Sequence, residues 1–401
     1  KEEGISKVLI GKDTRISGYM FESALQAGFI SAGMDVTLLG PLPTPGVSYL
    51  ANSNNQVGLV ISASHNLFED NGIKFFNKDG QKFSSELEKR IETKLTQEMI
   101  GVESINLGKA ARMSDAQGRY IEFCKSSFTD LDLNGLSILL DCANGATYSV
   151  APKVFSELGA NVETIGASPD GININQNCGS TSPNALKEAI IKDSYDIGIA
   201  FDGDGDRILI VTSDGDILDG DDILYILSKE IPANSGVVGT LMTNKALELY
   251  FQNEGIEFSR ADVGDKYVLQ RLIERSWVLG GEPSGHIICL DSAPTGDAIV
   301  AALKFLNATK DKGFSVEKSL EGFKKFPQTL INLKVNNPNK IIISDKFWEK
   351  VTEIELQLGE DGRVLIRPSG TEPLIRIMVE SKDSGISENL CNSLADLAQR
   401  I

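Results

Sequence analysis

Short apolar runs alternate with helix-like segments along most of the chain. The pattern predicts buried strands at Ile197–Phe201 and Ile208–Val211, and strands that alternate with helices are typical of α/β units. A weak repeat has the same organisation, because residues 28–36, 154–162 and 250–258 each contain the end of a helix pattern, a glycine and the start of a strand. We therefore expect three similar α/β domains.

An apolar strand that ends in a polar loop follows each copy of the repeat. In α/β sheets, binding sites form beyond the carboxyl ends of the strands, where such loops lie. Each of the three domains is therefore expected to contribute one chemical loop. The strands and their loops are 57–61 into Ser62–Asn66, 197–201 into Asp202–Arg207, and Val278–Leu279 into Gly280–His286.

The C-terminal part has a different pattern, which predicts a smaller α+β domain. A helix over 345–358 precedes a strand at 363–366, the loop Arg367–Pro373, a second strand at 374–380 and a last helix from about Ser384. A length of 401 residues accommodates several cores. The expected domains are 1–130, 131–232, 233–325 and 326–401.

Composition excludes several classes of partner. A formal net charge of −17 at pH 7 argues against nucleic acid or an anionic membrane, because either would require a broad basic face. No apolar run approaches the ~18–20 residues of a membrane span, and no signal-peptide pattern opens the sequence. Five scattered cysteines without a C-x-x-C pair predict a reduced, cytoplasmic protein. A homodimer is compatible with this composition.

Three carboxylates stand on alternate positions, Asp202, Asp204 and Asp206, with glycines between them and Arg207 directly after. Glycines allow the tight bend that brings such side chains together, and an all-oxygen set suits a hard ion such as Mg²⁺. An EF-hand would need glycine in place of Arg207 and glutamate in place of Ser213. That alternative fails, and a solvated acidic turn remains as the other interpretation.

The loop after residues 57–61 carries Ser64 and one of the two histidines, His65. Ser64 is either a nucleophile or an ordinary turn residue, and the G-x-S-x-G pattern of a nucleophile elbow is missing. Asn71–Gly72 predict a turn. Lys74 follows this turn, either as a functional cation or as a solvated side chain.

Two further loops contain groups that suit a phosphorylated sugar. Glu282 and Ser284 place a carboxylate and a hydroxyl two residues apart, with the second histidine, His286, after them; a structural turn is an equal alternative. The later loop begins with Arg367 and supplies a guanidinium, two hydroxyls and accessible backbone N–H groups, which suit a phosphate dianion. Its other candidate residues are Ser369, Gly370 and Thr371.

Two more cations, Lys12 and Arg15, stand at the end of the first predicted strand. In a chain with this net charge, cations beside such loops suggest contacts with an anionic ligand. Ordinary salt bridges are the alternative.

Four segments in order resemble the α-D-phosphohexomutase family, and the resemblance covers nearly the whole chain. The first segment, together with Leu374–Glu380 after the last one, is most similar to the branch of the family that interconverts glucosamine 6-phosphate and glucosamine 1-phosphate. The four segments are Ile61–Lys74, Asp202–Arg207, Gly281–His286 and Arg367–Pro373.

The resemblance implies three similar α/β domains with mixed sheets and a C-terminal α+β domain around a central cleft. It also implies a sugar phosphate as partner, a phosphorylated serine beside Mg²⁺, a hexosamine 1,6-bisphosphate intermediate, and a product that feeds cell-wall precursor synthesis. The implied roles are metal ligation by Asp202, Asp204, Asp206 and Ser64; sugar binding by Glu282 and Ser284; phosphate binding by Arg367, Ser369, Gly370 and Thr371; and contact with the transferring group by Lys74, Arg207 and His286. The candidates for proton transfer are Lys74, His65 and His286.

Three positions depart from the family pattern. Leu67, Pro283 and Ala298 stand where proline, glutamine and glycine are usual, and none of these changes removes a reacting group. The family also has a glycine-rich, arginine-containing segment before the first strand. No part of this sequence, which starts at Lys1, matches that segment, and we expect that truncation has removed it.

Three other functions stay open from the sequence. A phosphomannomutase or phosphoglucomutase would share the same motifs. A phosphatase with an aspartate nucleophile would need threonine or valine in place of Asp206. A non-catalytic sugar-phosphate binder would retain the loops without the reaction.

Overall fold

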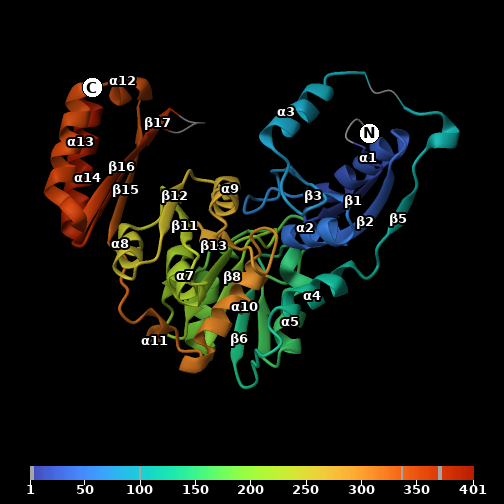
Figure 1. The fold of residues 1–401 in the computed structure, drawn as a ribbon, viewed down its shortest axis with the longest axis horizontal. Helices are drawn as coiled ribbons and strands as arrows, with labels where there is room; N and C mark the ends of the chain where they lie inside the picture. Colours follow the sequence, from blue (N-terminus) through green and yellow to red (C-terminus); the bar gives the residue numbers. More distant parts are fainter. Residues whose placement is uncertain (1–3, 99–100, 336, 369–372) are drawn as a thin grey trace. The chain divides into compact units, whose positions relative to one another are not determined.

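The computed structural model describes residues 4–98, 101–335, 337–368 and 373–401. The strands in these ranges form four separate sheets (Figure 1). The chain divides into two compact units. The first comprises residues 1–242 and 257–320 and contains three of the sheets, and the second comprises residues 243–256 and 321–401 and contains the fourth. Within the described ranges, no helix combines the length and the apolar character that crossing a membrane requires.

The first sheet has five strands, four of which run parallel. Its elements and the neighbouring helices are β1 (Lys7–Lys12), β2 (Asp35–Pro41), β3 (Val57–Ile61), β4 (Ile73–Phe76), β5 (Ala110–Arg112), α1 (Ser17–Ser31), α2 (Thr44–Ser53), α3 (Ser85–Lys94) and α4 (Ala116–Ser126). The strand order is β4-β3-β1-β2-β5. Alternate residues of β1 point to opposite faces, so Val8 and Ile10 share a core with Phe21 of α1, while Gly11 faces Val47 of α2. The helices α1 and α2 therefore cover opposite faces of this sheet.

The second sheet repeats this plan with the order β10-β9-β8-β6-β7. Its elements are β6 (Ser137–Asp141), β7 (Asn161–Ile165), β8 (Ile197–Phe201), β9 (Ile208–Thr212), β10 (Ile217–Leu218), α5 (Ala151–Glu157) and α6 (Asn184–Asp193). The strand β8 lies at the centre, is buried along its whole length and pairs antiparallel with β9. Both buried strands predicted from the apolar runs are confirmed.

The third sheet has the order β12-β11-β13-β14. Its elements are β11 (Val237–Thr240), β12 (Phe258–Ala261), β13 (Leu279–Gly281), β14 (Ile287–Cys289), α7 (Gly220–Leu227), α9 (Asp265–Arg275), α10 (Ala298–Thr309) and α11 (Val316–Leu320). The sequence pattern placed Gly280 and Gly281 in the loop, and this was wrong. They belong to β13 because β14 pairs with them antiparallel, and a side chain on Gly280 would press on the backbone of Val238.

The predicted helix, glycine and strand repeat is confirmed in all three places. The glycines that end the three helices are Gly33, Gly159 and Gly255, with φ angles of 75°, 101° and 70°. Only glycine adopts such angles readily, and it commonly ends a helix in this way.

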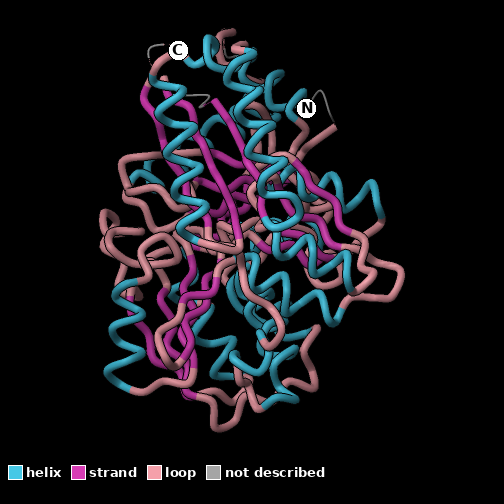
Figure 2. The backbone as a smooth tube through the Cα atoms, turned by 90° about the vertical axis from the view of Figure 1, so that its left-hand side faces the viewer, coloured by secondary structure: helices cyan, strands magenta, loops and turns pink. Residues whose placement is uncertain are grey.

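The second unit contains an antiparallel sheet with the order β15-β17-β16, whose long strands run side by side in Figure 2. Its elements are β15 (Gln328–Lys334), β16 (Gly362–Pro368), β17 (Leu374–Ser381), α8 (Lys245–Asn253), α12 (Pro338–Ile342), α13 (Asp345–Leu358) and α14 (Ser384–Gln399). The predicted helix over 345–358 is confirmed. The strand β15 was not predicted, and Arg367 and Pro368, which were assigned to a loop, lie in β16 because they pair with β17. The predicted boundaries between the four domains stay a prediction.

Candidate active site

Two loops that are far apart in sequence meet at Ser64. Ser64 follows β3 and Asp202 follows β8 directly. The hydroxyl Oγ of Ser64 donates a hydrogen bond of 2.7 Å to Oδ2 of Asp202. The carboxyl ends of strands in two different sheets thus deliver a hydroxyl and a carboxylate to the same point, as expected for α/β proteins.

The three carboxylates after β8 form one buried cluster. One oxygen from each of Asp202, Asp204 and Asp206 lies within 4.8 Å of the others. The second oxygen of Asp202, Oδ1, accepts backbone N–H groups from Gly205, Asp206 and Arg207 at 3.0, 3.1 and 3.2 Å. Oδ1 of Asp204 and Oδ1 of Asp206 are buried without a hydrogen-bond partner among the described residues. Buried carboxylate oxygens need a partner, and this oxygen set fits a hard divalent cation.

The electrostatics of the cluster are those of like charges held together. Burial, with the neighbouring charges of Asp206 and Asp204, raises the pKa of Asp202 well above its usual range. Burial also acts to raise the pKa of Asp206, but Lys74 and His286 outweigh it, and the pKa of that carboxyl is lowered. Such closely spaced acids need positive charge to stay ionised.

Two cations supply part of this charge. Nζ of Lys74 lies 2.6 Å from Oδ2 of Asp204 and 3.4 Å from Oδ2 of Asp206. Nδ1 of His286 lies 3.7 Å from Oδ1 of Asp206. Burial alone would lower the pKa of both cations, but the neighbouring acids raise both pKa values above their usual range. The alternative of a solvated Lys74 is therefore rejected, because its charge faces the acidic cluster.

Two residues at the site were missed by the sequence interpretation. The backbone N–H of Thr44, the first residue of α2, donates to the carbonyl of Asp204 at 2.9 Å, and its hydroxyl donates to Oδ2 of the same residue. Asp265, the first residue of α9, pairs with Lys82 and lies 3.7 Å from Nε2 of His286. No local motif marks either residue, because both contacts join positions that are distant in sequence.

His65 and Arg207 border the same cluster. Burial, followed by the charge of Arg207, lowers the pKa of His65 below its usual range, which favours the neutral imidazole. Within the described ranges, Nδ1 of His65 and Nε of Arg207 are buried without a hydrogen-bond partner. Both side chains therefore retain polar atoms that a ligand can engage.

The sugar-binding and phosphate-binding candidates are placed less completely. Glu282 is buried and its Oε1 accepts the N–H of Gly264 at 2.9 Å, while Ser284 is exposed. Gly285, with φ of 88°, closes the turn between them and His286. Arg367 is half-buried on β16 of the second unit. Ser369, Gly370 and Thr371 lie outside the described residues.

The cations at the end of the first strand, Lys12 and Arg15, turn inward instead of lining the site. Nζ of Lys12 pairs with Glu22 at 2.8 Å, and both side chains are buried. Nε of Arg15 pairs with Asp13 at 2.8 Å, again without exposure. The ordinary salt bridge is therefore the correct interpretation for these two residues.

The fold and this site define a phosphohexomutase, and the chain belongs to the phosphoglucomutase/phosphomannomutase family. The models of all four family domains match it in order. The alpha/beta/alpha domains I, II and III match residues 1–100, 118–215 and 219–326, and the C-terminal domain matches residues 330–397. The family resemblance inferred from the four motifs is confirmed.

Two individual relatives show which members of the family this chain is similar to. The chain is 51% identical over 405 residues to the phosphoglucosamine mutase of Legionella pneumophila strain Corby. The aligned region covers 98% of this chain and 89% of that protein. The chain is 52% identical to phosphoglucosamine mutase 1 of Shewanella amazonensis, with 98% and 90% covered.

Solved structures share the fold. A phosphoglucomutase/phosphomannomutase family protein from Burkholderia thailandensis has a TM-score of 0.84 at 23% identity and covers 99% of this chain and 90% of its own. The N-acetylphosphoglucosamine mutase of Aspergillus fumigatus, solved in complex with GlcNAc-6P and magnesium, has a TM-score of 0.68 at 18% identity, with 89% and 92% covered. The expected α/β class with a C-terminal α+β domain is confirmed.

Proposed function

We propose that this protein is a phosphoglucosamine mutase, an isomerase that interconverts glucosamine 6-phosphate and glucosamine 1-phosphate. The relatives that are 51% and 52% identical over nearly the whole chain are named for that activity. The observation that carries the chemistry is the 2.7 Å hydrogen bond between the Ser64 hydroxyl and Asp202, because it places a phosphorylatable oxygen at the edge of a carboxylate cluster that fits a cation.

Phosphoryl transfer requires alignment of the reacting oxygens and neutralisation of the charge on the phosphoryl oxygens. Asp202, Asp204 and Asp206 would hold Mg²⁺, with Ser64 as a further ligand, and the bound ion would supply positive charge at the phosphate. Lys74, 2.6 Å from Asp204, and Arg207 and His286 would contribute fixed positive groups beside it.

The reaction proceeds in two transfers. In the first transfer, a sugar hydroxyl attacks the phosphorus of phosphorylated Ser64. The bond between phosphorus and Oγ breaks, the hydroxyl proton passes to a base, and a hexosamine 1,6-bisphosphate forms. The bisphosphate reorients, Oγ of Ser64 attacks the other phosphate, and the sugar oxygen takes up a proton as it leaves. His65, whose pKa is lowered, is suited to accept a proton, and His286, whose pKa is raised, is suited to donate one.

The other candidate residues complete the assignment. Glu282 and Ser284 would hold sugar hydroxyls, and Arg367 with Ser369, Gly370 and Thr371 would hold the phosphate that is not reacting. We also infer a reducing cytoplasmic location, since all five cysteines are free and buried and reduced thiols suit that compartment.

Turnover of three substrates tests this proposal. Glucosamine, mannose and glucose 6-phosphates are compared side by side with Mg²⁺ and a trace of the matching hexose 1,6-bisphosphate, with Ser64→Ala as the inactive control. We expect the highest kcat/KM for glucosamine 6-phosphate. A higher value for mannose or glucose 6-phosphate would reassign the substrate, and the absence of turnover with all three would indicate a non-catalytic binder.

A further inference from the structure

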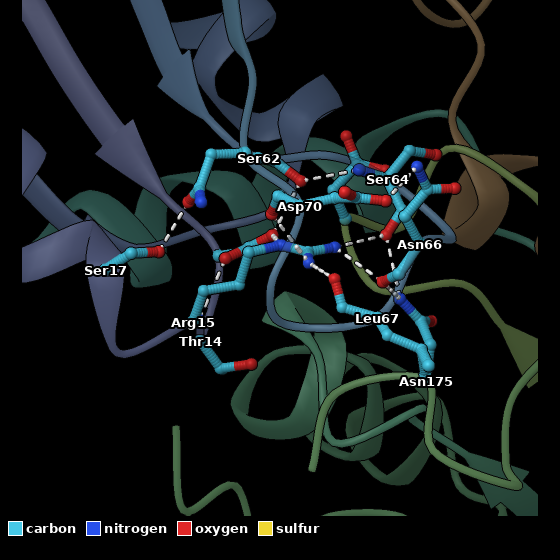
Figure 3. Close-up of polar contacts among 12 residues, drawn as sticks. Thr14, Arg15, Ser17, Ser62, Ser64, Asn66, Leu67, Asp70 and Asn175 are labelled. Carbon is cyan, nitrogen blue, oxygen red and sulfur yellow. Dashed lines mark hydrogen bonds and ion pairs between the residues drawn. The ribbon is translucent and has the colours of Figure 1, made fainter. Parts of the chain in front are cut away.

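The guanidinium of Arg15 is buried inside the turn of chain that carries Ser64 (Figure 3). Its Nε donates to Oδ2 of Asp13 at 2.8 Å. Nη1 and Nη2 each donate to two backbone carbonyls of the loop that follows β3. These acceptors are the carbonyls of Ser64 at 3.1 Å, Asn66 at 2.8 Å, Asp70 at 3.1 Å, and Leu67.

A guanidinium has five N–H donors in a rigid fork, and these five contacts use all of them. Arg15 therefore has no donor left for a phosphate, although it lies close to the reacting serine in the structure. Its contacts are with main-chain atoms of one loop, so what it determines is the path of that loop.

The backbone of Ser64 has an unfavourable conformation that needs such support. Its φ angle is +50°, in the left-handed region that residues with a side chain seldom adopt. The N–H of Ser64 donates to Oγ of Ser62 at 3.0 Å, and Ser62 in turn donates to Oδ2 of Asp13 at 2.7 Å. Asp13 thus holds the N–H side of Ser64 through Ser62 and the carbonyl side through Arg15.

Asn175, which lies between β7 and α6, also holds the loop that carries Ser64. Nδ2 of Asn175 donates to the carbonyls of Ser64 at 2.9 Å and Asn66 at 2.8 Å. These are two of the carbonyls that Arg15 also contacts, as Figure 3 shows. The serine loop is therefore fixed to the part of the chain that carries the aspartate cluster.

We propose that Arg15, backed by Asp13, is a positioning residue for phosphoryl transfer. It holds the Ser64 peptide in its left-handed conformation, and this keeps Oγ at the carboxylate cluster. The inference rests on the proposed function for its kinetic consequence, whereas the loop geometry itself can be measured independently of activity.

The variants Arg15→Lys and Arg15→Ala test this role. Lysine keeps the charge but lacks the fork, so both variants lose the shared hold on the carbonyls. We expect kcat to fall about a hundredfold, because a misplacement of about 1 Å at the reacting group has that effect, and we expect KM to stay unchanged, because Arg15 touches no substrate. Arg119→Ala is the matched control, since Arg119 is an exposed arginine paired only with Asp115 among the described residues.

Two further readouts separate positioning from general stability. Added guanidinium ion should partly restore kcat of Arg15→Ala and should not restore Ser64→Ala. Hydrogen exchange should accelerate at the amide of Ser64 and its neighbours in both Arg15 variants and stay at the wild-type rate in β8. A rise in KM with unchanged kcat, or wild-type exchange in the loop, would overturn the proposal.

The outcome also distinguishes this inference from the proposed function. If wild-type protein turns over glucosamine phosphates and the Arg15 variants match it, the positioning role fails and the mutase assignment stands. If wild-type protein shows no turnover, the exchange rates of the Ser64 loop still decide whether Arg15 holds it.

Discussion

Replacing the buried carboxylate of Asp297 with asparagine should remove a pH dependence from the stability of the region around the third sheet. Asp297 is 2% exposed and precedes α10. Its Oδ1 accepts the N–H groups of Ile299 and Val300 at 3.0 Å, and its Oδ2 accepts the hydroxyl of Tyr120 at 2.9 Å. The next residue, Ala298, donates its N–H to the carbonyl of Gly205 in the aspartate loop at 3.1 Å.

The magnitude follows from the pKa. Burial raises the pKa of Asp297 from 3.8 to about 6, against the smaller opposing effects of its hydrogen bonds. This difference corresponds to about 3 kcal/mol. The folded chain therefore retains the proton at pH values where the unfolded chain has lost it. The associated stability is fully present below the unfolded pKa and is lost as the pH rises through about 6, with about 2 kcal/mol of the loss falling between about pH 4.5 and 7.

Urea unfolding measures this effect in a Trp348→Phe background, where Trp277 is the single remaining tryptophan of the two in the chain. Trp277 is buried in the core of the third sheet and reports on its unfolding. Asparagine keeps an acceptor for the two N–H groups and does not titrate. Between about pH 4.5 and 7, the free energy of unfolding of Asp297→Asn should therefore rise by about 2 kcal/mol relative to that of its parent.

The exposed Asp311, which follows the same helix, supplies the control variant Asp311→Asn, in which an exposed carboxylate is replaced instead of a buried one. A constant difference between parent and Asp297→Asn would refute the reasoning. So would a variant that loses stability relative to its parent as the pH rises.

Three further substitutions have defined outcomes. Asp204→Asn removes one carboxylate charge from the cluster, and calorimetric titration should show Mg²⁺ binding weakened by about a hundredfold; unchanged affinity would place the ion elsewhere. Lys74→Met removes the cation 2.6 Å from Asp204, and single-turnover transfer to sugar should slow by about a thousandfold, as for other cations at a transferring phosphoryl group; wild-type kinetics would exclude that role. Gly285→Ala places a side chain at φ of 88° against the carbonyl of Ile208, and its free energy of unfolding in urea should fall by more than about 1 kcal/mol; an unchanged free energy of unfolding would contradict the turn geometry.

The extent to which the sequence predicted the fold depended on burial. The strand Ile197–Phe201 was predictable because a strand that is covered on both faces must be apolar throughout, and its five residues are all buried. The strand Gln328–Lys334 alternates between exposed and half-buried positions over most of its length, so it lacked such a run. Arg367 was assigned to a loop because its pairing with β17 is a tertiary contact that no local residue pattern encodes.

The candidate site shows the same limit. The motifs in the sequence pointed to Ser64 and the aspartates as candidates, and the structure brings them together. The sequence did not identify Thr44, which reaches Asp204 from 160 positions away. Nor did it distinguish an arginine that contacts a ligand from one that contacts backbone carbonyls, since Arg15 follows the first strand in either case and only the fold directs its guanidinium inward.

The central claim is that Ser64 carries the phosphoryl group, and site-resolved phosphorus labelling tests it most directly. The protein is incubated with Mg²⁺ and glucosamine 1,6-bisphosphate that bears labelled phosphorus, then digested and mapped, with Ser64→Ala treated in parallel. We predict acid-stable label on the Ser64 peptide alone, its discharge when glucosamine 1-phosphate is added, and no label in the variant. Label on an aspartate, or a wild-type protein that takes up no label, would contradict the account.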